Sequence, residues 1–190
     1  RFDAELDMRM DQSQKKSAKQ ILNEYSEKDL QRIFSEYGEV INAKKLARII
    51  VNKRKEAPLN TINDFKKAID ECVPKGAKEN SYLAQVFQSL RIETNDELGA
   101  LKEMLLQCAE VMKKDARLVI MSYHSLEDRL VKNFMNKGKF DGEIEKDEFG
   151  QPKEKAPFTQ ITKKPVQASE EEVKINSRSR SAKLRIAVKN

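Results

Sequence analysis

The sequence predicts an α/β protein in which a bundle of helices precedes a small sheet. Two observations lead to this prediction. Apolar residues recur at helical spacing through residues 15–74, with no strand pattern between them. Further along the chain, segments 118–121, 158–162 and 184–188 have the pattern of strands. The chain has 190 residues, 38% of them hydrophobic, which is enough for one ordinary core or for one core and a smaller domain.

Capping signals place the helices of the first half. Ser26 followed by Asp29 predicts one helix start and Thr61 followed by Asp64 predicts another, because a hydroxyl and an acidic group three residues apart can satisfy free amides. The helix expected between them, from Ala43, carries a run of basic residues: Lys44, Lys45, Arg48, Lys53, Arg54 and Lys55. Such a run is most often a solvated face, and phosphate contact is the alternative.

The stretch from Leu118 combines a strand, a polar turn and a helix start. Its first four residues form an unbroken apolar run, which is typical of a strand covered on both faces in a parallel sheet. The helix is predicted to be capped by Ser125, with Asp128 three residues later as in a capping box. Apolar residues then recur at helical spacing to Phe134.

This turn is the first candidate site. Ligands in open α/β sheets collect at the carboxyl ends of strands, so His124, Ser125, Asp128 and Arg129 would lie at the rim of a site. The alternative is that Ser125 and Asp128 only stabilise the helix start and that His124 is a satisfied turn residue.

The last third of the chain alternates between loop and ordered patterns. Residues 137–157 are rich in Lys, Glu, Asp, Gly and Pro and are predicted to form a mobile loop. Ser169 with Glu172 predicts a short helix. From Lys174 to the end there are six basic residues and no acidic ones, which favours contact with RNA or a cofactor phosphate over simple solvation.

Composition limits the classes of function. The net charge of +6 favours an anionic partner such as nucleic acid. One histidine cannot form a two-His metal site, and Cys72 and Cys108 suggest neither a disulfide nor a metal knuckle, so we expect a reduced, cytoplasmic setting and no metal. The six scattered glycines form no Gly-x-Gly loop for a nucleotide. No apolar run approaches the roughly 18 residues of a membrane span, so no membrane partner is expected.

Three strands would leave an open edge and an uncovered face. Partner strands are therefore expected upstream of Arg1.

Six motifs, in order, resemble the RsmH (MraW) family. They are Leu-Asp-Met-Arg-Met-Asp (6–11), Tyr-Gly-Glu with Ala-x-x-x-Ala-Arg-x-Ile (37–50), Phe-Gln-x-Leu-Arg-Ile with Asn-x-Glu-Leu (87–98), Ser-Tyr-His-Ser-Leu-Glu-Asp-Arg-x-Val-Lys (122–132), Lys-Pro-Val (164–166) and Asn-x-Arg-x-Arg-Ser-Ala-Lys-Leu-Arg (176–185).

The resemblance implies a bacterial S-adenosylmethionine-dependent methyltransferase acting on the N4 amine of a cytidine in the decoding region of 16S ribosomal RNA. Its fold would be part of a class I, Rossmann-like sheet with an inserted all-helical domain that recognises the substrate. The implied domains are 1–14 and 81–190 for the methyltransferase and 15–80 for the insertion. The family's glycine-rich cofactor loop has no counterpart here, so cofactor-binding residues are expected upstream of Arg1, and the chain alone is expected to be inactive.

On this hypothesis, the cytidine side of the site is lined by Asp7, Asp11, His124, Ser125 and Asp128. The residues expected to hold RNA phosphates are Arg9, Arg91, Arg129, Arg178, Arg180, Lys183 and Arg185. The small ribosomal subunit is the expected partner, and a homodimer is left open. Two other interpretations are a non-catalytic RNA- or ribosome-binding module and a helical protein-interaction domain. The latter leaves the turn within 118–132 and the arginine-rich end of the chain without a role.

Overall fold

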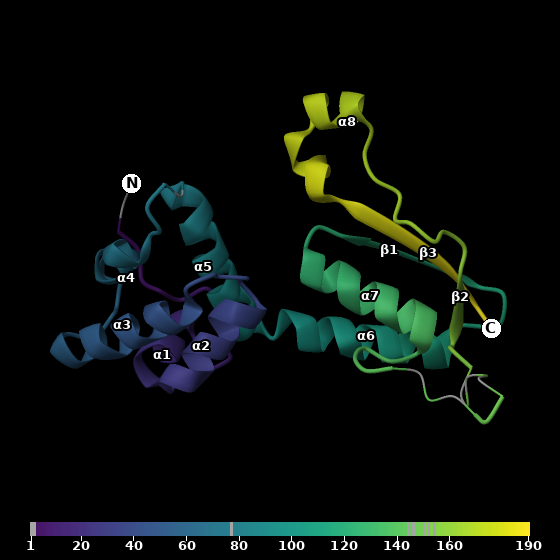
Figure 1. Ribbon diagram of the computed structural model, residues 1–190, viewed down its shortest axis with the longest axis horizontal. Helices are drawn as coiled ribbons and strands as arrows, with labels where there is room; N and C mark the ends of the chain where they lie inside the picture. Colours follow the sequence, from purple (N-terminus) through teal and green to yellow (C-terminus); the bar gives the residue numbers. More distant parts are fainter. Residues whose placement is uncertain are drawn as a thin grey trace. The chain divides into compact units, whose positions relative to one another are not determined.

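The computed structural model consists of helices in the first half of the chain and of helices with a small sheet in the second (Figure 1). It describes residues 3–76, 78–143, 145, 147–149, 151, 153 and 155–190. The chain divides into two compact units, Arg1–Glu97 and Leu98–Asn190, and each is described by itself. The predicted α/β class is confirmed, as a mixed structure with a three-stranded antiparallel sheet.

Unit 1 is a helical bundle. Its elements are α1 (Ala18–Glu24), α2 (Glu27–Glu36), α3 (Ala43–Glu56), α4 (Ile62–Ile69), the 3-10 turn η1 (Asp70–Cys72) and α5 (Glu79–Asn95). The predicted caps are confirmed: Ser26 Oγ accepts from the Asp29 amide at 3.1 Å, and Thr61 Oγ1 accepts from the Asp64 amide at 3.1 Å. The apolar faces of all five helices meet in one buried core.

Two segments that were predicted to belong to the methyltransferase domain pack into this core. Helix α5 lies beyond the predicted boundary at residue 80, but its Tyr82, Leu83, Val86 and Leu90 are buried in the bundle core. The first segment is also part of unit 1, since Leu6 is buried there and the Leu6 amide donates to the Asn60 carbonyl at 3.0 Å. The chain divides into compact units after Glu97. The predicted domain bounds at residues 14 and 80 stay a prediction.

Unit 2 contains a three-stranded sheet and helices on one of its faces. Its elements are α6 (Glu97–Val111), which begins at the division, β1 (Arg117–Ser122), α7 (Ser125–Lys137), β2 (Phe158–Gln160), α8 (Glu170–Ile175), the 3-10 turn η2 (Ser177–Ser181) and β3 (Lys183–Lys189). The strand order is β1-β3-β2, and both pairings are antiparallel. The predicted helix start at Ser169 is confirmed, since its Oγ accepts from the Glu172 amide at 3.1 Å.

The sheet of unit 2 is covered on one face. Leu118 and Ile120 of β1 pack against α6 and α7, together with Ala187 of β3. The alternate residues Val119 and Met121 are 53% and 54% exposed. The expectation of a strand covered on both faces in a parallel sheet is thus wrong for the described residues, because successive side chains of a strand point to opposite faces and helices cover only one of them.

The predicted mobile loop over 137–157 includes residues 144, 146, 150, 152 and 154, which lie outside the described residues. In its described part, the ring of Phe140 stacks on that of Phe134 with centroids 4.9 Å apart. The Phe140 carbonyl accepts from the Asn133 side-chain amide at 2.8 Å. Mobility of the loop stays a prediction.

The bundle depends on a glycine at the end of α2. A β-carbon at Gly38 would overlap Ser89 Oγ and lie 2.7 Å from the Gln85 carbonyl oxygen of α5. We expect Gly38→Ala to lower the free energy of unfolding by about 1–3 kcal/mol, the usual range for overpacking. Urea unfolding measures this, and adding Ser89→Ala should restore only part of it because the Gln85 carbonyl remains. Unchanged stability of Gly38→Ala would show that the helices do not approach this closely.

Candidate functional site at the end of strand β1

The turn after β1 caps its own helix. His124 is the N-cap of α7, and its Nδ1 accepts from the Leu126 amide at 3.2 Å. Glu127 Oε2 in turn accepts from the amides of Tyr123, at 3.1 Å, and His124, at 3.2 Å. The predicted cap of Ser125 with Asp128 is therefore wrong by one residue, because Ser125 is already the first residue of the helix.

This shift leaves Asp128 to pair with β3. Arg185 Nε donates to Asp128 Oδ1 at 2.6 Å, and Arg185 Nη2 donates to Asp128 Oδ2 at 3.0 Å. The side chain of Asp128 is only 11% exposed and that of Arg185 only 5%. Lys183 Nζ lies 3.6 Å from the Asp128 carboxylate. A bidentate pair of this kind is directional as well as strong, so it fixes the start of β3 against α7.

The charge of Asp128 is set by its neighbours. Burial acts to raise the pKa of Asp128, but the hydrogen bond from Arg185 and the charges of Arg185 and Lys183 outweigh burial and lower it below the usual value. A carboxylate with a lowered pKa is a weak base. Both oxygens already accept from Arg185, and a catalytic role for Asp128 stays a prediction.

A second arginine organises the loop at 7–14 in unit 1. Arg9 Nε lies 2.5 Å from Asp7 Oδ1 and Arg9 Nη2 donates to Asp7 Oδ2 at 3.0 Å. Arg9 Nη1 donates to the carbonyls of Gln12 and Gln14 at 3.2 and 2.7 Å. The pKa of Asp7 is lowered by its hydrogen bond from Arg9, and that of Asp11 by hydrogen bonds from Ser13. These contacts occupy Arg9 within the loop.

The remaining predicted RNA-binding residues differ in their surroundings. Arg91 is paired with Glu97, with Arg91 Nε 2.8 Å from Glu97 Oε1. Arg129, Arg178 and Arg180 are exposed, and among the described residues their guanidinium groups have no ion-pair partner. The structure thus brings His124, Ser125, Asp128, Lys183 and Arg185 together in unit 2. Asp7, Arg9, Asp11 and Arg91 lie in unit 1.

The turn after β1 does not fit a cofactor site for S-adenosylmethionine. The turn after β1 holds no glycine, and its amides at Tyr123, His124 and Leu126 already donate to Glu127 and His124. Across the described ranges there is also no group of three or more His, Cys, Asp or Glu side chains that could hold a metal ion. Within the same ranges, no helix is long and apolar enough to cross a membrane.

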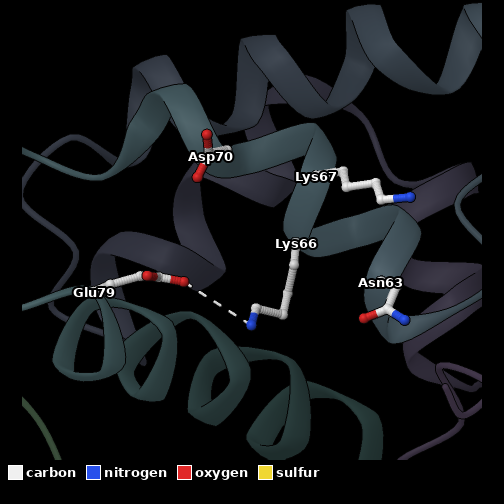
Figure 2. Close-up of a pocket in the computed structure, with 5 residues that line it drawn as sticks. All are labelled: Asn63, Lys66, Lys67, Asp70 and Glu79. Atoms are coloured by element: carbon white, nitrogen blue, oxygen red, sulfur yellow. Dashed lines mark ion pairs between the residues drawn. The ribbon is translucent and has the colours of Figure 1, made fainter. Parts of the chain in front are cut away.

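Unit 1 carries a polar hollow of about 340 Å³ beside α4. Figure 2 shows Lys66 reaching toward Glu79 across this hollow, with Nζ 3.9 Å from Oε1, while Lys67 points away. The lining balances two lysines with two acids and contains no aromatic ring. It offers neither net charge for a phosphate nor a surface on which a base could stack.

Unit 2 has a smaller hollow of about 250 Å³ beside the candidate turn. Tyr123 lines it, and so do Gln167 and Glu172, which the sequence did not single out as site residues. Glu172 was recognised only as part of a helix cap, because a capping pattern is visible in a local window. Residues of β1, β3 and the segment around α8 line the hollow. These segments are far apart in the sequence, so a local sequence pattern cannot show that they come together.

Comparison with known proteins places the whole chain in one group. Residues 1–190 match the MraW methylase family. The chain is 50% identical over 187 residues to ribosomal RNA small subunit methyltransferase H of Cytophaga hutchinsonii, covering 98% of this chain and 61% of that protein. The protein of the same name from Flavobacterium johnsoniae is 48% identical over 189 residues, covering 100% of this chain and 61% of the relative. The chain spans about three-fifths of the length of these relatives.

The ion pair between Asp128 and Arg185 is expected to dominate the stability of unit 2. Arg185→Leu leaves a buried carboxylate without its main partner, and breaking such a pair costs about 3–5 kcal/mol. Urea unfolding measures this loss, and Arg180→Leu, at an exposed arginine of the same segment, is the matched control. Replacing both partners, as Asp128→Leu with Arg185→Met, should recover most of the stability. Equal effects of Arg185→Leu and Arg180→Leu would contradict the assignment.

Acid should weaken unit 2 through the same pair. Because the pKa of Asp128 is lower in the folded state, its contribution to stability is complete above the unfolded-state pKa of about 4 and is lost as the pH falls through the folded-state value. Asp128→Asn removes that titration. The difference in unfolding free energy between the wild type and Asp128→Asn should therefore shrink between about pH 6 and about pH 3. A constant difference would refute the linkage.

Proposed function

The chain belongs to the MraW methylase family, and we propose that it forms the substrate side of an enzyme that methylates ribosomal RNA of the small subunit. The proposal rests on the match of all 190 residues to the family and on relatives named as ribosomal RNA small subunit methyltransferase H. In this proposal S-adenosylmethionine supplies the methyl group, and the protein works in the cytoplasm, where ribosomal subunits are assembled.

The proposed target is the N4 amine of a cytidine in the decoding region of 16S ribosomal RNA, as the six motifs of the family imply. Methylation of an aromatic amine requires the base to be placed with its amine toward the methyl donor, water to be excluded and one proton to leave the nitrogen. An enzyme acting on a base also needs that base out of its stack. The protein's task is therefore mainly placement.

Positive charge supports the choice of RNA. Arg178 and Arg180 project from η2, directly before β3, and no acid neutralises them among the described residues. Lys183 and Arg185, in contrast, face Asp128. We propose that the exposed arginines, with Arg129, hold RNA phosphates and that Arg185 and Arg9 shape the protein itself. Salt-dependent binding is the expected signature.

We propose positioning roles, too, for the predicted catalytic residues that are already engaged. Asp7 and Asp128 each accept a bidentate arginine, and His124 caps α7. Cofactor binding is assigned to the two-fifths of the relatives' length that this chain does not cover, in agreement with the uncovered face of the sheet. We keep the proposal that residues 15–80 form an inserted helical domain for substrate recognition, and α5 packs against the core of that segment.

A non-catalytic RNA-binding module is the second candidate. It is favoured by one observation: the amides of the turn after β1 already donate within the protein, which leaves few backbone donors there for S-adenosylmethionine. Both candidates predict RNA binding, and only methyl transfer separates them.

The test of the first candidate is methyl transfer by the full-length protein that carries this chain. Isotope-labelled S-adenosylmethionine and small ribosomal subunits lacking the modification are the substrates, and digestion followed by mass spectrometry identifies the product. We expect labelled N4-methylcytidine in 16S ribosomal RNA. Label in another nucleoside would refute the proposed target, and RNA binding without any label would favour the second candidate.

RNA binding by the arginine-rich turn should be electrostatic. Arg178→Ala combined with Arg180→Ala removes two charges that have no internal partner, so affinity for 16S ribosomal RNA fragments should fall and the salt slope should flatten by about two. Fluorescence anisotropy over a range of salt concentrations measures both quantities. Arg91→Ala, at an arginine already paired with Glu97, is the control and should change the slope by less than one. An unchanged slope in the double variant would exclude these arginines as phosphate ligands.

A further inference from the structure

Helix α3 of unit 1 is strongly basic. Six of its fourteen residues are lysine or arginine, and its one acidic residue is Glu56 at the last position. The sequence left two interpretations of this run open, a solvated face and a face that contacts phosphate. Which of the six basic side chains already have partners within the protein helps to decide between them.

Three of the six basic side chains are engaged within unit 1. Lys45 and Arg54 donate to backbone carbonyls of neighbouring segments, at 2.9 and 2.8 Å. Lys53 Nζ lies 3.4 Å from Glu56 Oε2. These three side chains are therefore partly satisfied by the protein itself.

The other three form a row along the outer face of the helix, the α3 row. Lys44, Arg48 and Lys55 are exposed, and in the described part of the chain none of them has a hydrogen-bond or ion-pair partner. Since an α-helix has about 3.6 residues per turn, the three side chains lie within about 40° of one another around its axis and span about 16 Å along it. The opposite face, with Leu46 and Ile50, is buried in the core of unit 1 and holds the row in place.

A neighbouring helix shows how a solvated face is usually arranged. On α2, Arg32 Nη1 lies 3.8 Å from Glu36 Oε2, so residues four apart carry opposite charges. Lys44 and Arg48 are also four residues apart, but like charges at this spacing repel one another and destabilise a helix. The α3 row is therefore unfavourable by itself, and an anion bound along it would offset the repulsion.

The chemistry of the α3 row limits its partner. Helix α3 contains no aromatic ring on which a base could stack, and the row contains no acid that could accept a hydrogen bond from a base. An anionic membrane surface is disfavoured, because the apolar face that would have to enter the lipid is buried in the core. The phosphates of a nucleic acid backbone suit a straight, rigid row of cations.

We propose that the α3 row binds the phosphate backbone of double-stranded RNA. The inference rests on the proposed function, which assigns ribosomal RNA to this chain, and it adds a contact in unit 1 to that of Arg178 and Arg180 in unit 2. Double-stranded RNA is recognised mainly through its shape and its phosphates, whereas single-stranded RNA is held largely by stacking of its bases. A row without aromatic rings suits the double strand.

The experiment titrates the full-length protein that carries this chain into a double-stranded and a single-stranded RNA of equal length. Fluorescence anisotropy is measured over a range of salt concentrations. The test variant combines Lys44→Gln, Arg48→Gln and Lys55→Gln. Its affinity for the double-stranded RNA should fall about tenfold or more, and the salt slope should flatten by about two to three, because three phosphate contacts are lost. Its affinity for the single-stranded RNA should change by less than about twofold.

The matched control removes three charges that already have acidic partners. Lys19→Gln, Lys53→Gln and Lys66→Gln change the net charge of unit 1 by the same amount, but each of these lysines is paired with a glutamate. We expect the control to bind double-stranded RNA within about twofold of the wild type. Urea unfolding shows that both variants fold, and the test variant should be at least as stable as the wild type because it lacks the repulsion within the row.

Equal affinities of the test variant and the control for double-stranded RNA would overturn the inference, while methyl transfer and RNA binding by Arg178 and Arg180 would stand. An equal loss of affinity for both RNAs would also overturn it, because the row would then not distinguish a double strand. Binding of a polyglutamate peptide to the row as tightly as double-stranded RNA would assign it to an acidic protein instead. If the wild type neither binds RNA nor transfers a methyl group to it, the proposed function fails together with the inference.

Discussion

The ion pair of Asp128 with Arg185 determines how unit 2 is arranged around the turn after β1. It joins the first turn of α7 to β3 through two hydrogen bonds of 2.6 and 3.0 Å in a buried setting. A buried carboxylate without this partner would be costly, so the pair constrains both elements at once. Since β3 continues directly from η2, fixing Arg185 also fixes the turn that carries Arg178 and Arg180.

The same constraint explains the unusual cap of α7. Asp128 is turned toward Arg185, and the free amides at the start of α7 are satisfied by His124 and Glu127, one residue earlier. Unit 1 contains a similar arginine–aspartate pair in the loop at 7–14, where Arg9 donates hydrogen bonds to Asp7 and to two backbone carbonyls. Met8 lies between the two with a φ of 62°, a left-handed conformation that such a network can hold in place. In both units an arginine expected to bind RNA shapes the protein.

Helix starts and the positions of strands could be predicted, because they depend on residues close together in the sequence. The starts at Ser26, Thr61 and Ser169 were predicted because hydroxyl caps have a clear signal at short spacing. The three predicted strands all form, as β1, β2 and β3. Their antiparallel order was not predicted, since β1 pairs with a segment more than sixty residues away. The cap at His124 was missed because histidine is not among the usual capping residues.

Long-range partners account for the other differences. Arg185 lies in a basic cluster and so was predicted to hold phosphate, whereas its acid partner is 57 residues distant and invisible to any window. Helix α5 was assigned to the second part because a linker seemed to precede it, but its apolar face completes the bundle core. Glu172 was noticed only because it lies three residues after the cap Ser169. The position of its carboxylate at the hollow could not be predicted from that spacing.

We propose that this chain supplies the substrate side of a methyltransferase and does not itself hold the methyl donor. The decisive experiment is calorimetric titration of S-adenosylmethionine into the 190-residue chain, beside the same titration into the full-length protein. We expect heat of binding for the full-length protein alone. Binding by the 190 residues themselves would refute this assignment, because the turn after β1, with its amides already occupied, would then have to open for the cofactor.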